Sequence, residues 1–163
     1  MTKIMKFRKR TYKNPAEFFK DLWFLTKNSG KIRKTMKSGI ISHAFRERLM
    51  LAVTAINGCK YCAYFHTKQA LKTGLTQEEV DLLLAGIIAN CPEDETIALI
   101  YAQYWAESNA KPDAEAVDKL NEVYGKEKAE AIHIILRMIR MGNLSGNTWD
   151  YFLYRISFGK RGR

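Results

Sequence analysis

Three side chains near the middle of the sequence could do redox chemistry together. Cys59 and Cys62 lie three residues apart at the expected start of a helix, so they share one face of it. Unpaired N–H groups and the helix dipole stabilise a thiolate at that end. Such a pair can close a disulfide and reopen it. His66 follows Cys62 by one turn, and its neutral imidazole can accept the thiol proton.

Glu47 is a candidate to orient His66. The expected turn at Asn57-Gly58 lies ten residues after Glu47, and His66 lies eight residues after Gly58. If the two helices form an antiparallel hairpin, the rise of ~1.5 Å per residue places both side chains at a similar height. A carboxylate at that height would fix the tautomer and the basicity of the imidazole.

The two cysteines also allow other interpretations. They could be structural thiols or half of a zinc site, and structural zinc needs four ligands. Cys59, Cys62 and His66 supply three ligands, and Cys91 or His43 would have to supply the fourth. A thioredoxin-like fold expects the motif beside a βαβ pattern, which this sequence lacks.

Capping residues and apolar spacing predict helices and no strand, so the expected fold class is all-α. Asn14, Pro15 and Glu17 form a helix start, and that helix should reach about Lys27. A short basic stretch follows over 31–37, without a predicted helix. Glycines at 125 and 142 are expected to end helices. The remaining helices are expected over 42–57, 59–73, 76–90, 95–109, 114–124, 126–141 and 148–156.

Charge divides the chain into two parts. Residues 1–40 carry twelve basic and two acidic side chains, whereas 41–163 carry equal numbers of each sign. The last thirteen residues add Arg155, Lys160, Arg161 and Arg163 without an acid. We therefore expect a basic N-terminal extension with an amphipathic helix over 1–40 and a helical domain over 41–163.

Composition limits the class of protein. The 163 residues are 47% hydrophobic, which is enough for a core and excludes a disordered chain. No apolar run approaches the length of a membrane span, and the N-terminus has no apolar signal segment. Three cysteines do not make a secreted disulfide framework. We expect a soluble, cytoplasmic protein.

The order Glu47, eleven residues, Cys59-x-x-Cys62, three residues, His66 resembles the motif of the AhpD-like alkylhydroperoxidases in the carboxymuconolactone decarboxylase superfamily. The resemblance is strongest over 42–90. It implies a multi-helical bundle with the Cys-x-x-Cys motif at the start of a central helix. It also implies a homotrimer or a homohexamer.

The resemblance further implies an antioxidant enzyme with peroxiredoxin-type peroxidase or disulfide oxidoreductase activity and no bound cofactor. Cys62 would be the attacking thiolate, and His66 and Glu47 would relay its proton. Cys59 would then resolve the sulfenic acid as a disulfide. An external dithiol, on a lipoyl group or a thioredoxin-like protein, would reopen that disulfide. From the residues alone the two cysteine roles stay open, because Cys59 is nearer the helix end and Cys62 is nearer the base.

Tyr61 departs from the family pattern. The well-characterised hydroperoxidases carry a histidine just before the second cysteine, at the position of Tyr61. Tyrosine can form hydrogen bonds but is a poor base near neutral pH. We therefore treat Tyr61 as an auxiliary residue whose effect on peroxidase activity is open.

Three other functions remain as alternatives. The cysteines could form a zinc-binding or redox-sensing module, or the chain could be a carboxymuconolactone decarboxylase-like enzyme for a different substrate. Residues 1–40 could bind nucleic acid or an anionic membrane surface, which would leave Phe18, Phe19 and Trp23 exposed. We favour packing of that helix on the body or on a neighbouring subunit. His133 is expected to be a packed core residue, and Cys91 a small buried hydrophobe.

Overall fold

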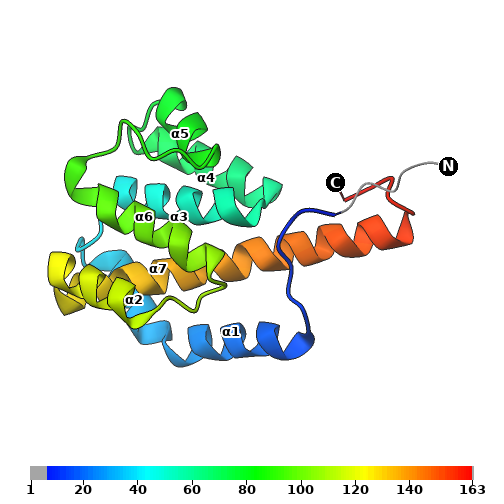
Figure 1. Cartoon of the computed structure of the whole chain (residues 1–163), viewed down its shortest axis with the longest axis horizontal. Helices are drawn as coiled ribbons and strands as arrows, with labels where there is room; N and C mark the ends of the chain where they lie inside the picture. The colour runs from blue at the N-terminus through cyan, green and yellow to red at the C-terminus, as the bar shows by residue number, and fades with distance from the viewer. Residues whose placement is uncertain (1–6, 163) are drawn as a thin grey trace.

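The computed structural model describes residues 7–162, and these residues form seven helices and no strand (Figure 1). The prediction of an all-α fold is therefore confirmed. The helices are α1 (Pro15–Lys27), α2 (Ser29–Lys37), α3 (His43–Asn57), α4 (Lys60–Lys72), α5 (Gln77–Leu84), α6 (Glu93–Glu107) and α7 (Ala114–Ile156).

Helix α3 is the centre of the bundle. It packs against α4, α5, α6 and α7. Its Ser42 cap accepts a hydrogen bond from the Phe45 N–H at 3.0 Å, and every residue from Leu49 to Thr54 is buried. The continuous apolar run over these positions is therefore explained by a helix that is covered on all sides.

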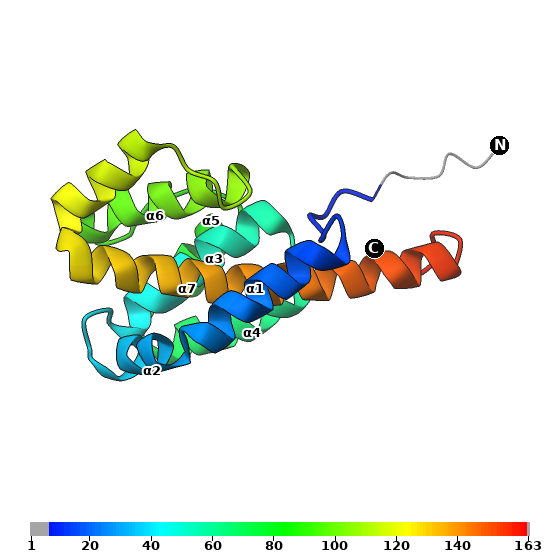
Figure 2. The same ribbon diagram turned by 90° about the horizontal axis from the view of Figure 1, so that it is seen from below.

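Helix α7 extends along the whole bundle, and its C-terminal part projects beyond the other helices (Figures 1 and 2). The sequence predicts three helices here. One break is confirmed at Gly125, which has φ 72° and ψ 159°. The expected end at Gly142 is wrong, because Gly142 lies inside the helix, where it packs against α4 rather than ending a turn.

Two other helix boundaries also differ from those expected. Helix α2 forms where a basic stretch without a helix was expected, and ion pairs from Lys31 and Lys34 to α7 accompany it. Helix α5 ends at Leu84 rather than near Asn90, because the chain turns at 85–86.

Residues 7–14 are extended and lie against the end of α3 and the C-terminal half of α7. The Arg10 N–H donates to the Asn57 carbonyl at 3.2 Å, and the Tyr12 N–H donates to the Thr148 hydroxyl at 3.2 Å. Asp21 is buried in α1 and forms an ion pair with Arg140 of α7. The basic N-terminal segment therefore packs on the helical body as far as it is described.

Parts of the charged ends remain without a structural account. Lys3, Lys6 and Arg163 lie outside the described residues. The boundary at residue 40 stays a prediction. Among the helices at 7–162, none combines the length and the apolar character that a membrane span requires.

Candidate active site

The turn between α3 and α4 brings Glu47 and His66 together. Gly58 adopts the left-handed conformation (φ 75°, ψ 30°), which reverses the chain directly before the cysteine motif. The Glu47 Oε2 and His66 Nδ1 atoms lie 2.7 Å apart. The expected antiparallel geometry of these two side chains is therefore confirmed, while their catalytic roles stay predictions.

Glu47 is held as a buried carboxylate. Glu47 is only 3% exposed, and Arg46 Nε donates to its Oε1 at 3.3 Å. A carboxylate accepts hydrogen bonds, so we assign the imidazole hydrogen to Nδ1 of His66. This tautomer leaves Nε2 of His66 free to accept a proton.

The two cysteines form one hydrogen-bonded pair. Cys59 is the N-cap of α4, and its Sγ accepts from the Cys62 N–H at 3.3 Å. The two Sγ atoms lie 2.7 Å apart, and both cysteines are free thiols. Disulfide closure therefore needs only a small approach of the two sulfur atoms.

The negative charge of this pair is favoured at Cys59. The hydrogen bond from the Cys62 thiol lowers the pKa of Cys59 to about 6, against the opposing effect of burial. The N–H groups of Cys62 and Tyr61 and the Asn143 side chain also favour the Cys59 thiolate. The same hydrogen bond, together with burial, raises the pKa of Cys62. These hydrogen bonds therefore favour the thiolate on Cys59 and the proton on Cys62.

Access to the two thiols differs. A cavity of about 400 Å³ opens beside Cys62 and His66, whereas Cys59 is 1% exposed and does not line it. Apolar side chains dominate its wall. The lining residues are Met36, Arg46, Glu47, Met50, Cys62, Phe65, His66, Gln69, Met138, Ile139 and Gly142. A small apolar molecule in this cavity could reach Cys62 but not Cys59.

Residues of α7 whose part in the site the sequence pattern does not indicate lie beside the two thiols. A Cβ atom added at Gly146 would lie 3.1 Å from Cys59 Sγ, and one added at Gly142 would lie 3.8 Å from Cys62 Sγ. The fully buried Asn143 follows Gly142 in α7, and its side-chain amide accepts from Asn57 and donates to Thr54 of α3. The available signal was the spacing of the glycines, four residues apart, which is typical of one helix face that packs closely.

Alanine at Gly146 and alanine at Gly142 should have opposite effects. Each change gains about 0.5–1 kcal/mol of helix propensity. Gly146→Ala also crowds the Cys59 sulfur, at a cost of about 1–3 kcal/mol, whereas 3.8 Å at Gly142 is an ordinary contact. We therefore expect Gly142→Ala to raise the free energy of unfolding and Gly146→Ala to lower it. Urea unfolding of the two reduced variants measures this, and equal changes would contradict the close contact at Cys59.

Tyr61 is bound to α7. Its hydroxyl donates to Asp150 Oδ1 at 2.8 Å, and this hydrogen bond raises the pKa of Tyr61. The buried Asp150 also pairs with Lys9 and Lys60. Tyr61 does not line the cavity beside Cys62. Its geometry is that of an anchor for the first turn of α4.

The remaining candidates lie elsewhere. Within the described part of the chain, no group of three or more His, Cys, Asp or Glu side chains could hold a metal ion. Cys91 donates to the Ala89 carbonyl, and burial raises its pKa to about 11. His43 is exposed at the far end of α3 from the motif. His133 Nε2 lies 2.6 Å from the Tyr101 hydroxyl, and burial lowers its pKa, which confirms a packed histidine.

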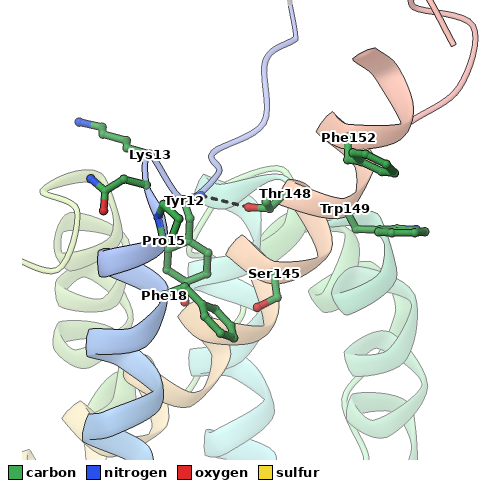
Figure 3. A pocket seen from close by; sticks show the side chains of 9 residues that line it. Tyr12, Lys13, Pro15, Phe18, Ser145, Thr148, Trp149 and Phe152 are labelled. Carbon is green, nitrogen blue, oxygen red and sulfur yellow. Dashed lines mark hydrogen bonds between the residues drawn. The ribbon is translucent and has the colours of Figure 1, made fainter. Parts of the chain in front are cut away.

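A second cavity of about 500 Å³ lies between the start of α1 and the C-terminal half of α7 (Figure 3). Aromatic side chains dominate it, and the Thr148 hydroxyl in its wall already accepts from Tyr12 N. No cysteine, histidine or carboxylate lines it. Its titratable side chains are those of Tyr12 and Lys13, and the Tyr12 hydroxyl donates to Asp21 at 2.9 Å, so this cavity lacks the thiol and the imidazole of the site at Cys62. Its lining residues are Tyr12, Lys13, Asn14, Pro15, Phe18, Ser145, Thr148, Trp149 and Phe152.

The sequence of residues 23–103 is similar to one known protein family. The family model described as the carboxymuconolactone decarboxylase family matches residues 23–103. The matched range runs from α1 into α6 and contains Glu47, Cys59, Cys62 and His66. No curated protein and no solved structure shows significant similarity to the chain.

Proposed function

Because the chain belongs to the carboxymuconolactone decarboxylase family, we propose that it is an AhpD-like thiol peroxidase or disulfide oxidoreductase. The observation that carries this proposal is the Glu47–His66 hydrogen bond of 2.7 Å beside a cavity that also exposes Cys62. A nucleophilic thiol, a base and a group that orients the base are the three parts of an activated nucleophile. Cys59 is the second thiol, with which Cys62 can form a disulfide.

In the proposed reaction Cys62 attacks an organic hydroperoxide. The Cys62 proton moves to His66, directly or through one water, and the thiolate forms an S–O bond as the O–O bond breaks. Cys62 becomes a sulfenic acid, and the alkoxide takes the proton from His66 and leaves as the alcohol. The Cys59 thiolate then attacks the sulfenic sulfur, the S–O bond breaks, the leaving hydroxide takes a proton from solvent to become water, and the disulfide closes. Two thiols thus supply the two electrons that reduce the hydroperoxide.

An external dithiol completes the proposed cycle. It attacks the Cys59–Cys62 disulfide, passes through a mixed disulfide and leaves as an oxidised dithiol. A lipoyl group or a thioredoxin-like protein has this chemistry. Because the resting state is a dithiol, the proposal also places the protein in a reducing compartment such as the cytoplasm.

Titration of free thiols tests the proposal directly. The reduced chain has three thiols, and one equivalent of tert-butyl hydroperoxide should leave one, on Cys91. Trypsin cleaves after Lys60, so Cys59 and Cys62 fall on different peptides that a disulfide would join. Three free thiols after treatment would contradict the peroxidase.

The second candidate is a carboxymuconolactone decarboxylase-like reaction on another substrate. Arg46, Glu47 and His66 together line the cavity, and this arrangement favours acid–base chemistry that needs no thiol. A Cys62→Ser variant separates the two, since it should keep such an activity and lose the peroxidase.

About one zinc per chain in protein purified without chelator would favour the metal-binding alternative instead.

We propose that the chain assembles into a homotrimer or homohexamer. Exposed aromatic side chains on α1 and α7 support this, because contiguous apolar surface on a protein marks interaction sites. Phe19 and Trp23 of α1 are 62% and 67% exposed, and Trp149 and Phe152 of α7 and Phe158 just after it are also exposed. The mass in solution, measured by light scattering, tests assembly.

A monomer that binds DNA or anionic vesicles at low salt would favour the nucleic-acid or membrane alternative for residues 1–40.

A further inference from the structure

We propose that the guanidinium of Arg46 binds a carboxylate in the cavity beside Cys62, so that the site prefers hydroperoxides whose apolar chain ends in a carboxylate. The inference rests on the proposed function, because it names a substrate class for the same cavity. The binding of the carboxylate itself does not depend on peroxidase activity.

Arg46 is a largely buried arginine that the protein provides with few acceptors. Its side chain is only 16% exposed. Its Nε donates to Glu47 Oε1 at 3.3 Å, and its Nη1 lies 3.7 Å from the sulfur of Met36, which is a weak acceptor. Within residues 7–162, Glu47 is the only carboxylate that pairs with Arg46, and it is shared with His66. A guanidinium carries five N–H donors in a planar fork, so donors remain for a ligand.

Arg48, two residues further along α3, has both sides of its fork filled. Its side chain is 11% exposed, which is close to the value for Arg46. Its Nε donates to Glu79 at 2.6 Å, and its Nη1 donates to Glu95 at 3.0 Å. Two arginines of similar burial on one helix therefore differ by one carboxylate partner. The cavity is the place from which a ligand could supply that partner to Arg46.

The cavity places the guanidinium of Arg46 near the reactive groups. Arg46 and His66 contact different oxygens of the Glu47 carboxylate, so they flank one side chain. Both also line the cavity of about 400 Å³ into which Cys62 opens. This volume lies in the range of small-molecule sites. A carboxylate at Arg46 and a peroxide at Cys62 can therefore belong to one small molecule.

Flexible apolar side chains form much of the remaining wall. Three of them are methionines on different helices, Met36 of α2, Met50 of α3 and Met138 of α7. Methionine is unbranched and polarisable, so it adapts to ligands of different shape. A charge-assisted hydrogen bond is strong in such surroundings. The wall should therefore tolerate different apolar chains, while the guanidinium fixes which end of the ligand faces Arg46.

The test compares the binding of hexanoate and of hexanamide, its neutral analogue, to the reduced full chain. The NMR signals of the Gln69 side-chain amide and the Gly142 N–H report binding, because both residues line the cavity. Hexanoate should bind at least about tenfold more tightly, which is the lower end for hydrogen bonds to a charged group. Acetate carries the charge without the apolar chain and should bind more weakly than hexanoate.

Three variants assign the preference to one side chain. Arg46→Gln should bind hexanoate and hexanamide equally, whereas Arg46→Lys should keep most of the preference because the charge remains. Arg48→Gln is the matched control, since it removes a similarly buried arginine of α3 that does not line the cavity. It should leave the preference for hexanoate unchanged.

Equal affinity of wild type for hexanoate and hexanamide would overturn the proposal, as would no binding of hexanoate at millimolar concentration. A preference that survives in Arg46→Gln, or equal affinity for acetate and hexanoate, would also overturn it. If Arg46→Gln does not fold, the side-chain N–H signals of Arg46 in wild type decide. They should move when hexanoate is added and stay fixed with hexanamide, and the reverse would contradict the assignment.

The two proposals fail separately. Hexanoate and hexanamide contain no peroxide, so their binding stays readable if the protein is not a peroxidase. Conversely, oxidation by tert-butyl hydroperoxide needs no carboxylate and stays readable if Arg46 binds none. Where both hold, a hydroperoxide that ends in a carboxylate should show a lower KM than the alkyl hydroperoxide of equal length, with kcat unchanged.

Discussion

Replacing Cys62 by serine should slow the peroxide-driven loss of thiols by more than ~10³-fold, since removing a catalytic nucleophile can cost as much as ~10⁶-fold. Cys62 lines the cavity beside His66, whereas Cys59 is buried outside it. The remaining thiolate on Cys59 therefore has charge but no access. Serine preserves the size of the side chain, so the fold should be unaffected.

The matched variant, Cys59→Ser, should behave differently. Cys62 should still react with the hydroperoxide, but without a resolving thiol it should stop at the sulfenic acid. A dimedone adduct on the Cys62 peptide, absent from wild type, would detect this state by mass spectrometry. Cys91→Ser controls for the third thiol and should react as wild type. Oxidation of Cys62→Ser as fast as wild type would reverse the two roles or remove the mechanism.

The two cysteines differ in both charge and access: the thiolate is favoured on Cys59, but the cavity reaches Cys62. The resemblance implies Cys62 as the attacking thiolate, and the cavity supports access to Cys62. The hydrogen bonds favour the resting thiolate on Cys59. Both hold if the Cys62 proton leaves only during attack, while the Cys59 thiolate stands ready to attack the sulfenic acid. The division between attack and resolution then follows from position, and not from the resting pKa alone.

Local features of the site could be predicted from the sequence because they depend on one hairpin. The positions of Glu47 and His66 follow from helix rise and one turn at Gly58, so their contact was accessible from spacing. The caps at Asn14, Ser42 and Thr76 are likewise local, and each side chain accepts the backbone N–H of the residue three positions later.

The contribution of α7 could not be predicted in the same way. Gly142 is far from Cys62 in the sequence, and a glycine after an apolar helical run is typical of a helix end. Only the packing of α7 on α4 shows that it allows close approach. Helix α2 was missed for a related reason, because Lys31 and Lys34 find their acidic partners on α7.

Replacing Glu47 by glutamine should slow peroxide oxidation of Cys62 by ~10²-fold, the lower end of the usual contribution of a positioned base. Glutamine keeps the shape, but it removes the charge that stabilises a protonated His66 and fixes the Nδ1 hydrogen. Stopped-flow oxidation with tert-butyl hydroperoxide measures the rate. The pKa of Cys59 should stay unchanged, because Glu47 is not among the groups that shift it.

Glu79→Gln is the control for the loss of a buried carboxylate. Glu79 is 6% exposed and accepts from Arg48 Nε at 2.6 Å, as Glu47 accepts from Arg46 on the same helix. Each substitution removes a buried carboxylate charge that accepts from an arginine, so both should lower the free energy of unfolding by about 1.5–3 kcal/mol. Only Glu47→Gln should slow oxidation, because only Glu47 contacts the imidazole. If both variants lose stability and oxidation rate in equal proportion, Glu47 acts through the fold, and the base at His66 needs no carboxylate.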